Sequence, residues 1–357
     1  MNVFELPHKT PFMVVNLKKL RKNYYDLKAA LPNVGIYYAI KSFPHKTIIQ
    51  TLNLLGCSFD VASNGEIDIL NEVNVYPEST IHTHPIKKHT DIKCALNYGI
   101  DTFVVDNVIE LEKFKEYKDK VKLLIRVCFR AKTAVVDLSK KFGCFPDDVS
   151  TLIERAKDLG IRIKGLSFHV GSQTKDASDH VMAINKCLEI MSQYHELTVL
   201  DIGGGFPARY NDDVLNIQDF CEPIRGVLSQ VPSHIRVICE PGRVLVGDIS
   251  TTVTSVVGKA TRDGVIWYYM DDGVYGMFSG IIFDHMTYPL STNVNGELKP
   301  CVLAGPTCDS IDIIGEGIML PELNVGDRVC GDVMGAYTYA TATTFNSIKI
   351  PKLVFIT

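Results

Sequence analysis

An alternation of two residue patterns is the feature that most limits how this chain can fold. From about residue 15 to residue 247, short runs of β-branched and aromatic residues alternate with longer amphipathic segments. We predict eight strands from these runs: Gly35–Ile40, Ser58–Val61, Thr80–Thr83, Thr102–Val105, Leu123–Val127, Gly165–Phe168, Leu197–Ile202 and Ile235–Cys239. Eight strand–helix units in about 230 residues match a (β/α)8 barrel. A doubly wound open sheet is the rival, but it usually has fewer units and a GxGxxG first turn, which the sequence lacks.

The pattern changes after residue 248. Short alternating runs are separated there by Gly, Asp, Asn and Pro, which is typical of an antiparallel β-domain. The predicted strands are Thr251–Val257, Val265–Met270, Cys301–Ala304, Arg328–Val333 and Leu353–Ile356. The first dozen residues read as extended and precede the first barrel unit. We therefore expect an α/β barrel over residues 15–247 and a β-domain formed by residues 1–14 and 248–357.

Composition narrows the functional classes. The chain has 357 residues and a formal net charge of −4, so its overall charge lacks the excess of basic residues that is typical of nucleic-acid-binding proteins. No apolar stretch approaches the ~20 residues of a membrane span, and the N-terminal sequence has no signal-peptide pattern. The ten cysteines are scattered without CxxC pairs, which argues against a zinc site and favours a reducing compartment. We expect a cytoplasmic protein that binds no metal, nucleic acid or membrane.

Polar side chains stand at the ends of the predicted barrel strands. Lys41 closes the first strand, Asp60 lies late in the second, and His84 follows the third. Arg126 lies late in the fifth strand, and His169 ends the sixth. A single lysine or histidine would more often be a surface or core residue. Because barrel enzymes place their chemistry at the carboxyl ends of the strands, the collective placement favours an active site.

The loops after the seventh and eighth strands indicate a phosphate site. The seventh strand ends in Asp-Ile-Gly-Gly-Gly-Phe-Pro, with glycines at positions 203–205, and the eighth in Cys-Glu-Pro-Gly-Arg, which ends at Arg243. Glycines let backbone N–H groups approach a phosphate, and barrels usually bind phosphate in these two loops. Arg243 can add a charge-assisted contact. A Gly-rich turn alone would be a weak signal, so its position carries the prediction.

A cofactor hypothesis follows from these positions. Glu240 precedes Pro241, next to the predicted phosphate site, where a carboxylate can keep a pyridine nitrogen protonated. Lys41 can form a Schiff base, and His169 can cover a ring face. A lysine, a phosphate cradle, an acid and a histidine together indicate pyridoxal phosphate.

The segment from Gly305 to Asp312 sets a thiol beside a carboxylate, at Cys308 and Asp309. A thiol can give a proton to a carbanion, and a carboxylate can hold an ammonium group. By itself the segment could equally be an ordinary turn with a buried cysteine.

Nine ordered motifs show a family resemblance that covers nearly the whole chain. They are YYAIK, FDVASNGEI, SFHVGSQ, DIGGGFP, EPGR, DDGVYGMF, FDH, GPTCDSID and GAYTYATATTFN. The chain closely resembles the eukaryotic-type ornithine decarboxylases, within the alanine-racemase-like, barrel-plus-β-domain class of pyridoxal-phosphate enzymes. The resemblance implies decarboxylation of L-ornithine to putrescine and carbon dioxide, in polyamine biosynthesis, by a homodimer with shared active sites.

The resemblance also implies roles for individual residues. Lys41 would carry the cofactor as a Schiff base, His169 would stack on its ring, and Glu240 would pair with the ring nitrogen. The implied cofactor-binding positions are Lys41, Asp60, Glu66, Arg126, His169, Ser172, Gly203, Gly204, Gly205, Glu240, Gly242, Arg243 and Tyr337. The implied catalytic set is Lys41, Cys308, His169 and Glu240.

For the substrate, a diamino acid, the resemblance implies a further set of positions. Asp284 and Asp309 would grip the distal amino group. Tyr275 stands where the family has a site tyrosine, and Phe283 is also assigned to the substrate set. Cys308 would protonate Cα after carbon dioxide leaves. In this family Cys308 and Asp309 enter from the partner subunit.

Other activities stay open. Lysine is one methylene longer than ornithine, and a methylene discriminates by only ~1–3 kcal/mol, so a lysine or lysine/ornithine decarboxylase is the main alternative. Arginine and diaminopimelate suit the two Asp residues less well. An inactive regulatory homologue would not need to keep Lys41 and Cys308. The chain departs from the family by its short tail, by the stretch at residues 293–299, and by His84, where a small amide side chain is expected.

Overall fold

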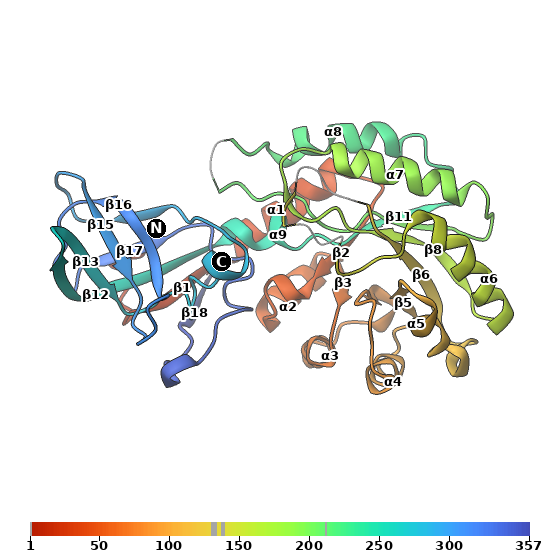
Figure 1. Cartoon of the computed structure of the whole chain (residues 1–357), viewed down its shortest axis with the longest axis horizontal. Coiled ribbons are helices and arrows are strands. Elements are labelled where there is room, and N and C mark those ends of the chain that lie inside the picture. The colour runs from red at the N-terminus through yellow and green to blue at the C-terminus, as the bar shows by residue number, and fades with distance from the viewer. Residues whose placement is uncertain (1, 130–133, 137–139, 211–212) are drawn as a thin grey trace. The chain divides into compact units, whose positions relative to one another are not determined.

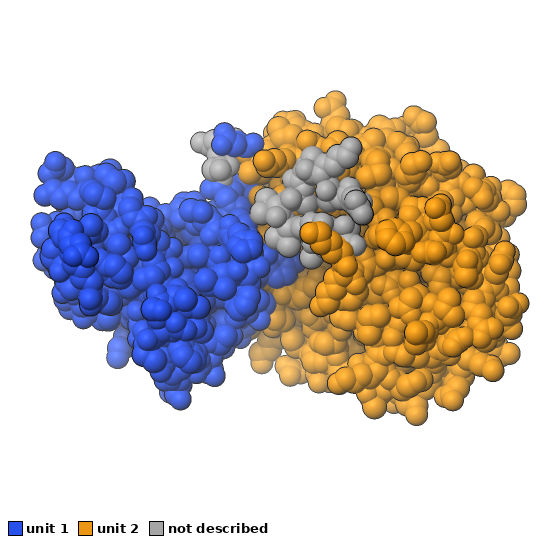
Figure 2. Space-filling model, in the orientation of Figure 1, with its two compact units in different colours: residues 1–20, 208–213, 245–357 blue, residues 21–207, 214–244 orange. Residues whose placement is uncertain are grey.

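The computed structural model describes residues 2–129, 134–136, 140–210 and 213–357. The chain divides into two compact units, which Figure 2 colours separately. One contains residues 21–207 and 214–244, and the other contains residues 1–20, 208–213 and 245–357. Within the described ranges, no helix is both long enough and apolar enough to cross a membrane.

The first unit is a closed barrel, as the alternating pattern predicts (Figure 1). Its eight strands are parallel, and each pairs with the next around the ring. In ring order they are β2 (Gly35–Ala39), β3 (Ser58–Val61), β4 (Thr80–His82), β5 (Thr102–Val105), β6 (Lys122–Val127), β8 (Ile163–Phe168), β10 (Val199–Asp201) and β11 (Arg236–Cys239). Each lies within two residues of its predicted bounds.

Helices cover the outside of the barrel and fill the connections between the strands (Figure 1). They are α1 (Leu17–Ala30), α2 (Lys46–Leu54), α3 (Asn64–Glu72), α4 (His89–Tyr98), α5 (Val108–Glu112), α6 (Val149–Leu159), α7 (Ser178–Met191) and α8 (Ile217–Leu228). Their ends follow local chemistry. The side chains of Ser63 and Asn107 accept the first free N–H groups of α3 and α5, and Gly99 and Gly160 end α4 and α6 with positive φ.

The apolar runs of the barrel strands are buried on both faces, as parallel strands between a core and a helix layer must be. Inside the barrel, Tyr37, Ile81 and Ile238 pack together with the partly buried Val199. This packing fixes the strands, and the strands in turn fix the polar residues that follow them at the carboxyl end.

The second unit is an eight-stranded sheet. Its main path runs β14 (Leu290–Thr292), β17 (Arg328–Gly331), β12 (Ser250–Arg262), β13 (Val265–Met270), β15 (Lys299–Ala304) and β16 (Ile313–Leu320), and β1 (Phe12–Asn16) joins β12 to β18 (Lys352–Ile356). The sequence predicts an antiparallel sheet, but β1–β18 and β13–β15 are parallel. Both parallel pairs join segments far apart in the chain, so no tight hairpin restricts their direction.

Three shorter features also belong to the described chain. β7 (Ala134–Val136) pairs with β9 (Ser172–Thr174) in a separate two-stranded sheet. Helices α9 (Arg243–Val246) and α10 (Gly280–Phe283) each have a single turn. They carry residues that the sequence assigns to the site.

Candidate active site

Lys41 stands just beyond β2, in a single 3-10 turn at Ile40–Ser42. Its Nζ lies 3.0 Å from Oδ2 of Asp60, which is buried at the end of β3. The hydroxyl of Thr83, just beyond β4, donates to the other oxygen of Asp60 at 2.5 Å. The Lys41 side chain is 41% exposed, so the amine is anchored yet accessible. An amine in this state can condense with an aldehyde at the carboxyl end of the barrel.

Glu66 lies in the first turn of α3, where the charges of Asp60 and Lys41 act on it. Its Oε2 accepts the N–H of Ala62 at 2.6 Å. Burial is the main cause that raises the pKa of Glu66 to about 7. The negative charge of Asp60 acts in the same direction, while the hydrogen bond to Ala62 and the charge of Lys41 oppose the change. Glu66 therefore holds the chain after β3 and carries a proton below neutral pH.

The loop after β10 comes too close to its neighbours for any side chain. A Cβ on Gly203 would overlap the carbonyl of Phe168, and one on Gly204 would lie 2.7 Å from the carbonyl of Glu240. Gly203 and Gly205 also have φ of 64° and 96°, in the left-handed region that glycine favours. The loop is thus a bare backbone surface of the kind that binds phosphate.

Arg243 and Ser172 meet beside this loop. The guanidinium of Arg243, at the start of α9 and after the buried Gly242, donates to Oγ of Ser172 at 3.2 Å. The carbonyl of Gly171, one residue before Ser172, lies 2.6 Å from the place of a Cβ on Gly205. A cation, a hydroxyl and glycine backbone therefore converge, which is the donor set that a phosphate requires.

Two buried carboxyl groups lie next to the phosphate loop. Oε1 of Glu240 and Oδ2 of Asp201 accept no hydrogen bond from any third residue among those described, although both are buried, and the two carboxyl groups lie within hydrogen-bonding reach of each other. Burial raises the pKa of Glu240 well above its ordinary value, and the charge of Asp201 adds to the effect. A buried acceptor without a partner is costly unless a donor arrives. The N–H of a protonated pyridine would satisfy Oε1, so this oxygen fits pyridoxal phosphate.

His169 follows β8 as a half-buried neutral ring. Its Nδ1 accepts the N–H of Gly171 at 3.0 Å, and its Nε2 lies 3.1 Å from the place of a Cβ on Gly204. Burial lowers the pKa of His169 well below its ordinary value, and the charges of Arg126 and Lys41 lower it further. An uncharged flat ring beside the glycine loop is suited to stack on a flat cofactor.

His180 supports the glycine loop, a role that could not be predicted from the sequence. This residue lies in α7 and is fully buried, between the rings of Phe206 and Phe220. Its Nε2 lies 3.0 Å from the carbonyl of Gly204. Burial lowers the pKa of His180 to about 4, so the ring is neutral and its Nε2–H donates. A histidine in an amphipathic helix gives no signal of this contact in the sequence.

The Cys308–Asp309 segment lies in the second unit. Cys308 is exposed, and its Sγ lies 3.4 Å from the side-chain amide of Asn346. The hydroxyl of Tyr275 donates to Oδ2 of Asp309 at 2.5 Å and lowers the pKa of that carboxyl. The ring of Tyr275 stacks on Phe345 at 4.5 Å. The structure therefore brings Tyr275 and Asp309 together, and adds Asn346, to which the sequence assigns no role.

Asp312 gives this segment its shape. One oxygen accepts the N–H of Val274 at 2.8 Å, and the other accepts that of Thr307 at 3.0 Å. A Cβ on Gly273 or on Gly305 would overlap the carboxylate. The segment is thus a fixed loop rather than packing around a buried cysteine.

Three further predicted positions, Phe283, Asp284 and Tyr337, lie elsewhere in the same unit. Asp284 is half-buried just after α10, and Phe283 is exposed on that helix. Tyr337 has a φ of 56°, a left-handed conformation that is uncommon for tyrosine and is often found at functional sites. Its carbonyl accepts the hydroxyl of Thr341 at 2.6 Å.

Comparisons with known proteins agree with this geometry. Residues 17–247 match the model of the family described as "Pyridoxal-dependent decarboxylase, pyridoxal binding domain". A lysine/ornithine decarboxylase from Vibrio vulnificus, solved with putrescine, is 50% identical, with a TM-score of 0.93 over 97% of this chain and 94% of that chain. The lysine/ornithine decarboxylase of Selenomonas ruminantium is 37% identical over 97% of this chain and 90% of its own length. The ornithine decarboxylase of Rattus norvegicus is 34% identical over 98% of this chain and 81% of its own. The chain therefore belongs to the ornithine decarboxylase-like family of pyridoxal-dependent decarboxylases.

Proposed function

We propose that this protein converts L-ornithine to putrescine and carbon dioxide. The carrying observation is the arrangement at the carboxyl end of the barrel, where the accessible amine of Lys41 is paired with Asp60 and the buried Oε1 of Glu240 has no partner other than Asp201 among the described residues. Pyridoxal phosphate is the cofactor of the family, and it supplies an aldehyde for an amine and a ring that accepts the electron pair left when carbon dioxide departs.

The barrel residues would hold this cofactor. Lys41 would bind its aldehyde carbon, His169 would cover its ring, and Glu240 would keep its ring nitrogen protonated. Asp60, Glu66 and Arg126 would brace the lysine and the ring. The phosphate would be bound by Ser172, Gly203, Gly204, Gly205, Gly242, Arg243 and Tyr337. The support for this assignment is the bare backbone of the glycine loop and the bond between Arg243 and Ser172.

The substrate's distal amine would be held by two carboxylates. The bond from Tyr275 keeps Asp309 ionised, which suits it to an ammonium group. Asp284 supplies the second carboxylate, and Phe283 lies beside it in sequence. After carbon dioxide has left, the thiol of Cys308 gives a proton to Cα.

The assembly would be a homodimer with two shared sites. Cys308 and Asp309 would serve the site of the partner subunit, so neither chain would be complete alone. Residues 15–247 would form the cofactor domain, and residues 1–14 and 248–357 would carry the substrate and dimer contacts. All ten cysteines are free, which suits a cytoplasmic enzyme of polyamine biosynthesis.

A second candidate is the decarboxylation of both lysine and ornithine. The two relatives from Vibrio vulnificus and Selenomonas ruminantium are both lysine/ornithine decarboxylases, at 50% and 37% identity, against 34% for the rat ornithine decarboxylase. One methylene changes the preference by only about 10- to 200-fold. A single site can therefore turn over both amino acids.

A release assay for carbon dioxide separates these functions. The purified protein is given ornithine, lysine, arginine and diaminopimelate in parallel, with Lys41→Ala as the control that lacks the amine. We expect the highest kcat/KM with ornithine. A kcat/KM for lysine within tenfold of that value would establish the dual activity. Turnover of none of the four would refute the proposal and leave the inactive regulatory homologue.

A further inference from the structure

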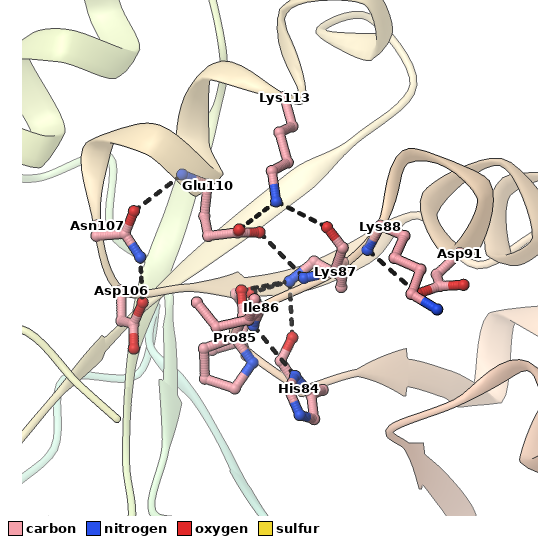
Figure 3. A network of polar contacts seen from close by, with 11 residues as sticks. His84, Pro85, Ile86, Lys87, Lys88, Asp91, Asp106, Asn107, Glu110 and Lys113 are labelled. Carbon is pink, nitrogen blue, oxygen red and sulfur yellow. Dashed lines mark hydrogen bonds and ion pairs between the residues drawn. The ribbon is translucent and has the colours of Figure 1, made fainter. Parts of the chain in front are cut away.

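Lys87 is a buried lysine in the loop that follows β4. Only 2% of it is exposed, yet its Nζ donates to three backbone carbonyls (Figure 3). These are the carbonyls of His84 at 2.7 Å, Pro85 at 2.9 Å and Val104 at 2.6 Å. An ammonium group has three N–H donors, so the backbone satisfies all of them. Because Val104 belongs to β5, Lys87 ties the loop after β4 to the neighbouring strand.

The backbone of Lys87 is held from the other side by α5. Its N–H donates to Oε2 of Glu110 at 3.1 Å, and its carbonyl accepts from Nζ of Lys113 at 2.8 Å. Lys113 and Glu110 also form an ion pair with each other (Figure 3). Burial lowers the pKa of Lys87 to about 7, against the charges of Glu110 and Asp106. Below pH 7 the ammonium form with three donors therefore predominates.

Asp106 carries the connection on to the loop after β6. It directly follows β5, and its two oxygens accept from the side-chain amide of Asn107 at 2.7 Å and from the N–H of Gly143 at 2.9 Å. Gly143 has a φ of 100°, and a Cβ there would lie 2.8 Å from the backbone nitrogen of Cys128. The next residue, Cys144, donates its N–H to the carbonyl of Arg126 at 2.9 Å. Asp106 thus holds the described end of the connection after β6, at Gly143 and Cys144.

These loops bring three side chains together. The rings of His84 and Phe142 meet edge to face at 5.3 Å, and the guanidinium of Arg126 lies 5.4 Å from the same Phe142 ring. Nδ1 of His84 accepts the N–H of Ile86 at 3.1 Å, which fixes the orientation of its ring. His84 directly follows Thr83, whose hydroxyl donates to Asp60, and Asp60 is the ion-pair partner of Lys41. His84 therefore lies one residue from the contacts that anchor the reactive amine. We call His84, Phe142 and Arg126 the aromatic wall.

We propose that Lys87 is a positioning residue for the cofactor site. By tying the loops after β4 and β5, and through Asp106 the segment at residues 142–144, it sets the aromatic wall beside Lys41. The inference rests on the proposed function in that the wall borders the cofactor. It assigns His84 a place in the site, where its family resemblance alone leaves the role open. The three bonds from Nζ of Lys87 go to backbone carbonyls, so Lys87 acts on the wall through the loops that it ties.

The test replaces Lys87 with Met, which has a similar length and no donor. Lys88→Met is the matched control, because Lys88 is the next residue and is exposed. Purified apoprotein is titrated with pyridoxal phosphate at pH 6.5, and amide hydrogen exchange is followed over residues 84–88 and 140–145. We expect Lys87→Met to raise the Kd for pyridoxal phosphate at least tenfold and to speed exchange at Gly143, while Lys88→Met matches the wild type.

A second variant, Asp106→Asn, keeps the test decisive if Lys87→Met fails to fold. Both partners of Asp106 are donors, so Asp106→Asn turns an amide NH2 towards one of them while the size is kept. It is expected to raise the same Kd and the same exchange rate. A lower melting temperature in Lys87→Met with a Kd within twofold of the wild type would overturn the proposal and leave a structural role. If Lys87→Met does not fold, an unchanged Kd in Asp106→Asn overturns it. Neither readout requires decarboxylation, so the proposed activity can fail separately.

Discussion

Glu240→Gln tests the electronic role of the buried carboxyl group. The N–H of Glu240 is bonded to the carbonyl of Gly203 at 2.8 Å, so the backbone is held in place. The side chain is 8% exposed, and its Oε1 has no partner other than Asp201 among the described residues. Gln has the same shape, so it keeps the packing and removes only the ionisable oxygen. A neutral amide cannot stabilise a protonated ring nitrogen as a carboxylate does.

The magnitude follows from the strength of the lost contact. A hydrogen bond to a charged group contributes about 1.5–3 kcal/mol. If this contact strengthens as negative charge moves into the ring, its loss falls on the reaction step, where about 1.4 kcal/mol is a factor of ten. We therefore expect kcat to fall by about 10- to 150-fold. The Kd for pyridoxal phosphate should change less, because the phosphate and Lys41 contacts remain.

The assay compares Glu240→Gln with Asp201→Asn, since Asp201 is a neighbouring carboxyl group that is also buried. The charge of Asp201 raises the pKa of Glu240, so removing it makes Glu240 easier to ionise and should leave kcat within about threefold. Carbon dioxide release and cofactor absorbance are measured on the same samples. A Glu240→Gln protein with full cofactor content and a kcat within twofold of the wild type would refute the reasoning.

Two further predictions concern the proton donor and the glycine loop. Cys308→Ala should still release carbon dioxide but yield less putrescine per carbon dioxide, and an unchanged product yield would exclude the thiol as the proton donor. Mixing Cys308→Ala with Lys41→Ala subunits should restore activity if the two sites of the dimer are shared. The pKa of His180 is about 4 in the folded chain, against an ordinary value of 6.5 for an exposed histidine. Between these two pH values the unfolded chain binds more protons than the folded chain. The free energy of unfolding therefore falls as the pH drops through this range, by up to about 3 kcal/mol. Urea unfolding of the apoprotein should therefore show the advantage of wild type over His180→Phe shrinking from pH 7 to pH 4, and a constant difference would contradict the assignment.

The barrel could be predicted because its signal is local. A parallel strand that is buried on both faces appears in the sequence as a short apolar run, and the helices between the strands show the 3.6-residue periodicity of an amphipathic helix. All eight strands could therefore be predicted from the sequence. The mixture of parallel and antiparallel strand pairs in the second sheet could not be predicted from the sequence. The pairing of β1 with β18 joins residues 12–16 to residues 352–356, and no local pattern encodes a partner at that distance.

Some residues of the site could likewise be predicted from the sequence, and others could not. Residues at strand ends, such as Lys41 and Asp60, were predictable because the fold brings the ends of parallel strands to one edge. His180, Asn346 and Lys87 were not, since each acts on a backbone or side chain that lies far away in sequence. Lys87 reads as one more surface lysine in a basic stretch, yet it is 2% exposed and bonded to three carbonyls.

The sequence by itself determined which elements form, which family the chain resembles and which chemical groups stand at the strand ends. Only the tertiary structure decided which of those groups are buried, which are paired and which are left with an open acceptor. The physical reason is that residue type and spacing act locally, whereas pKa values and hydrogen bonds depend on desolvation and on neighbours that the closed barrel brings together.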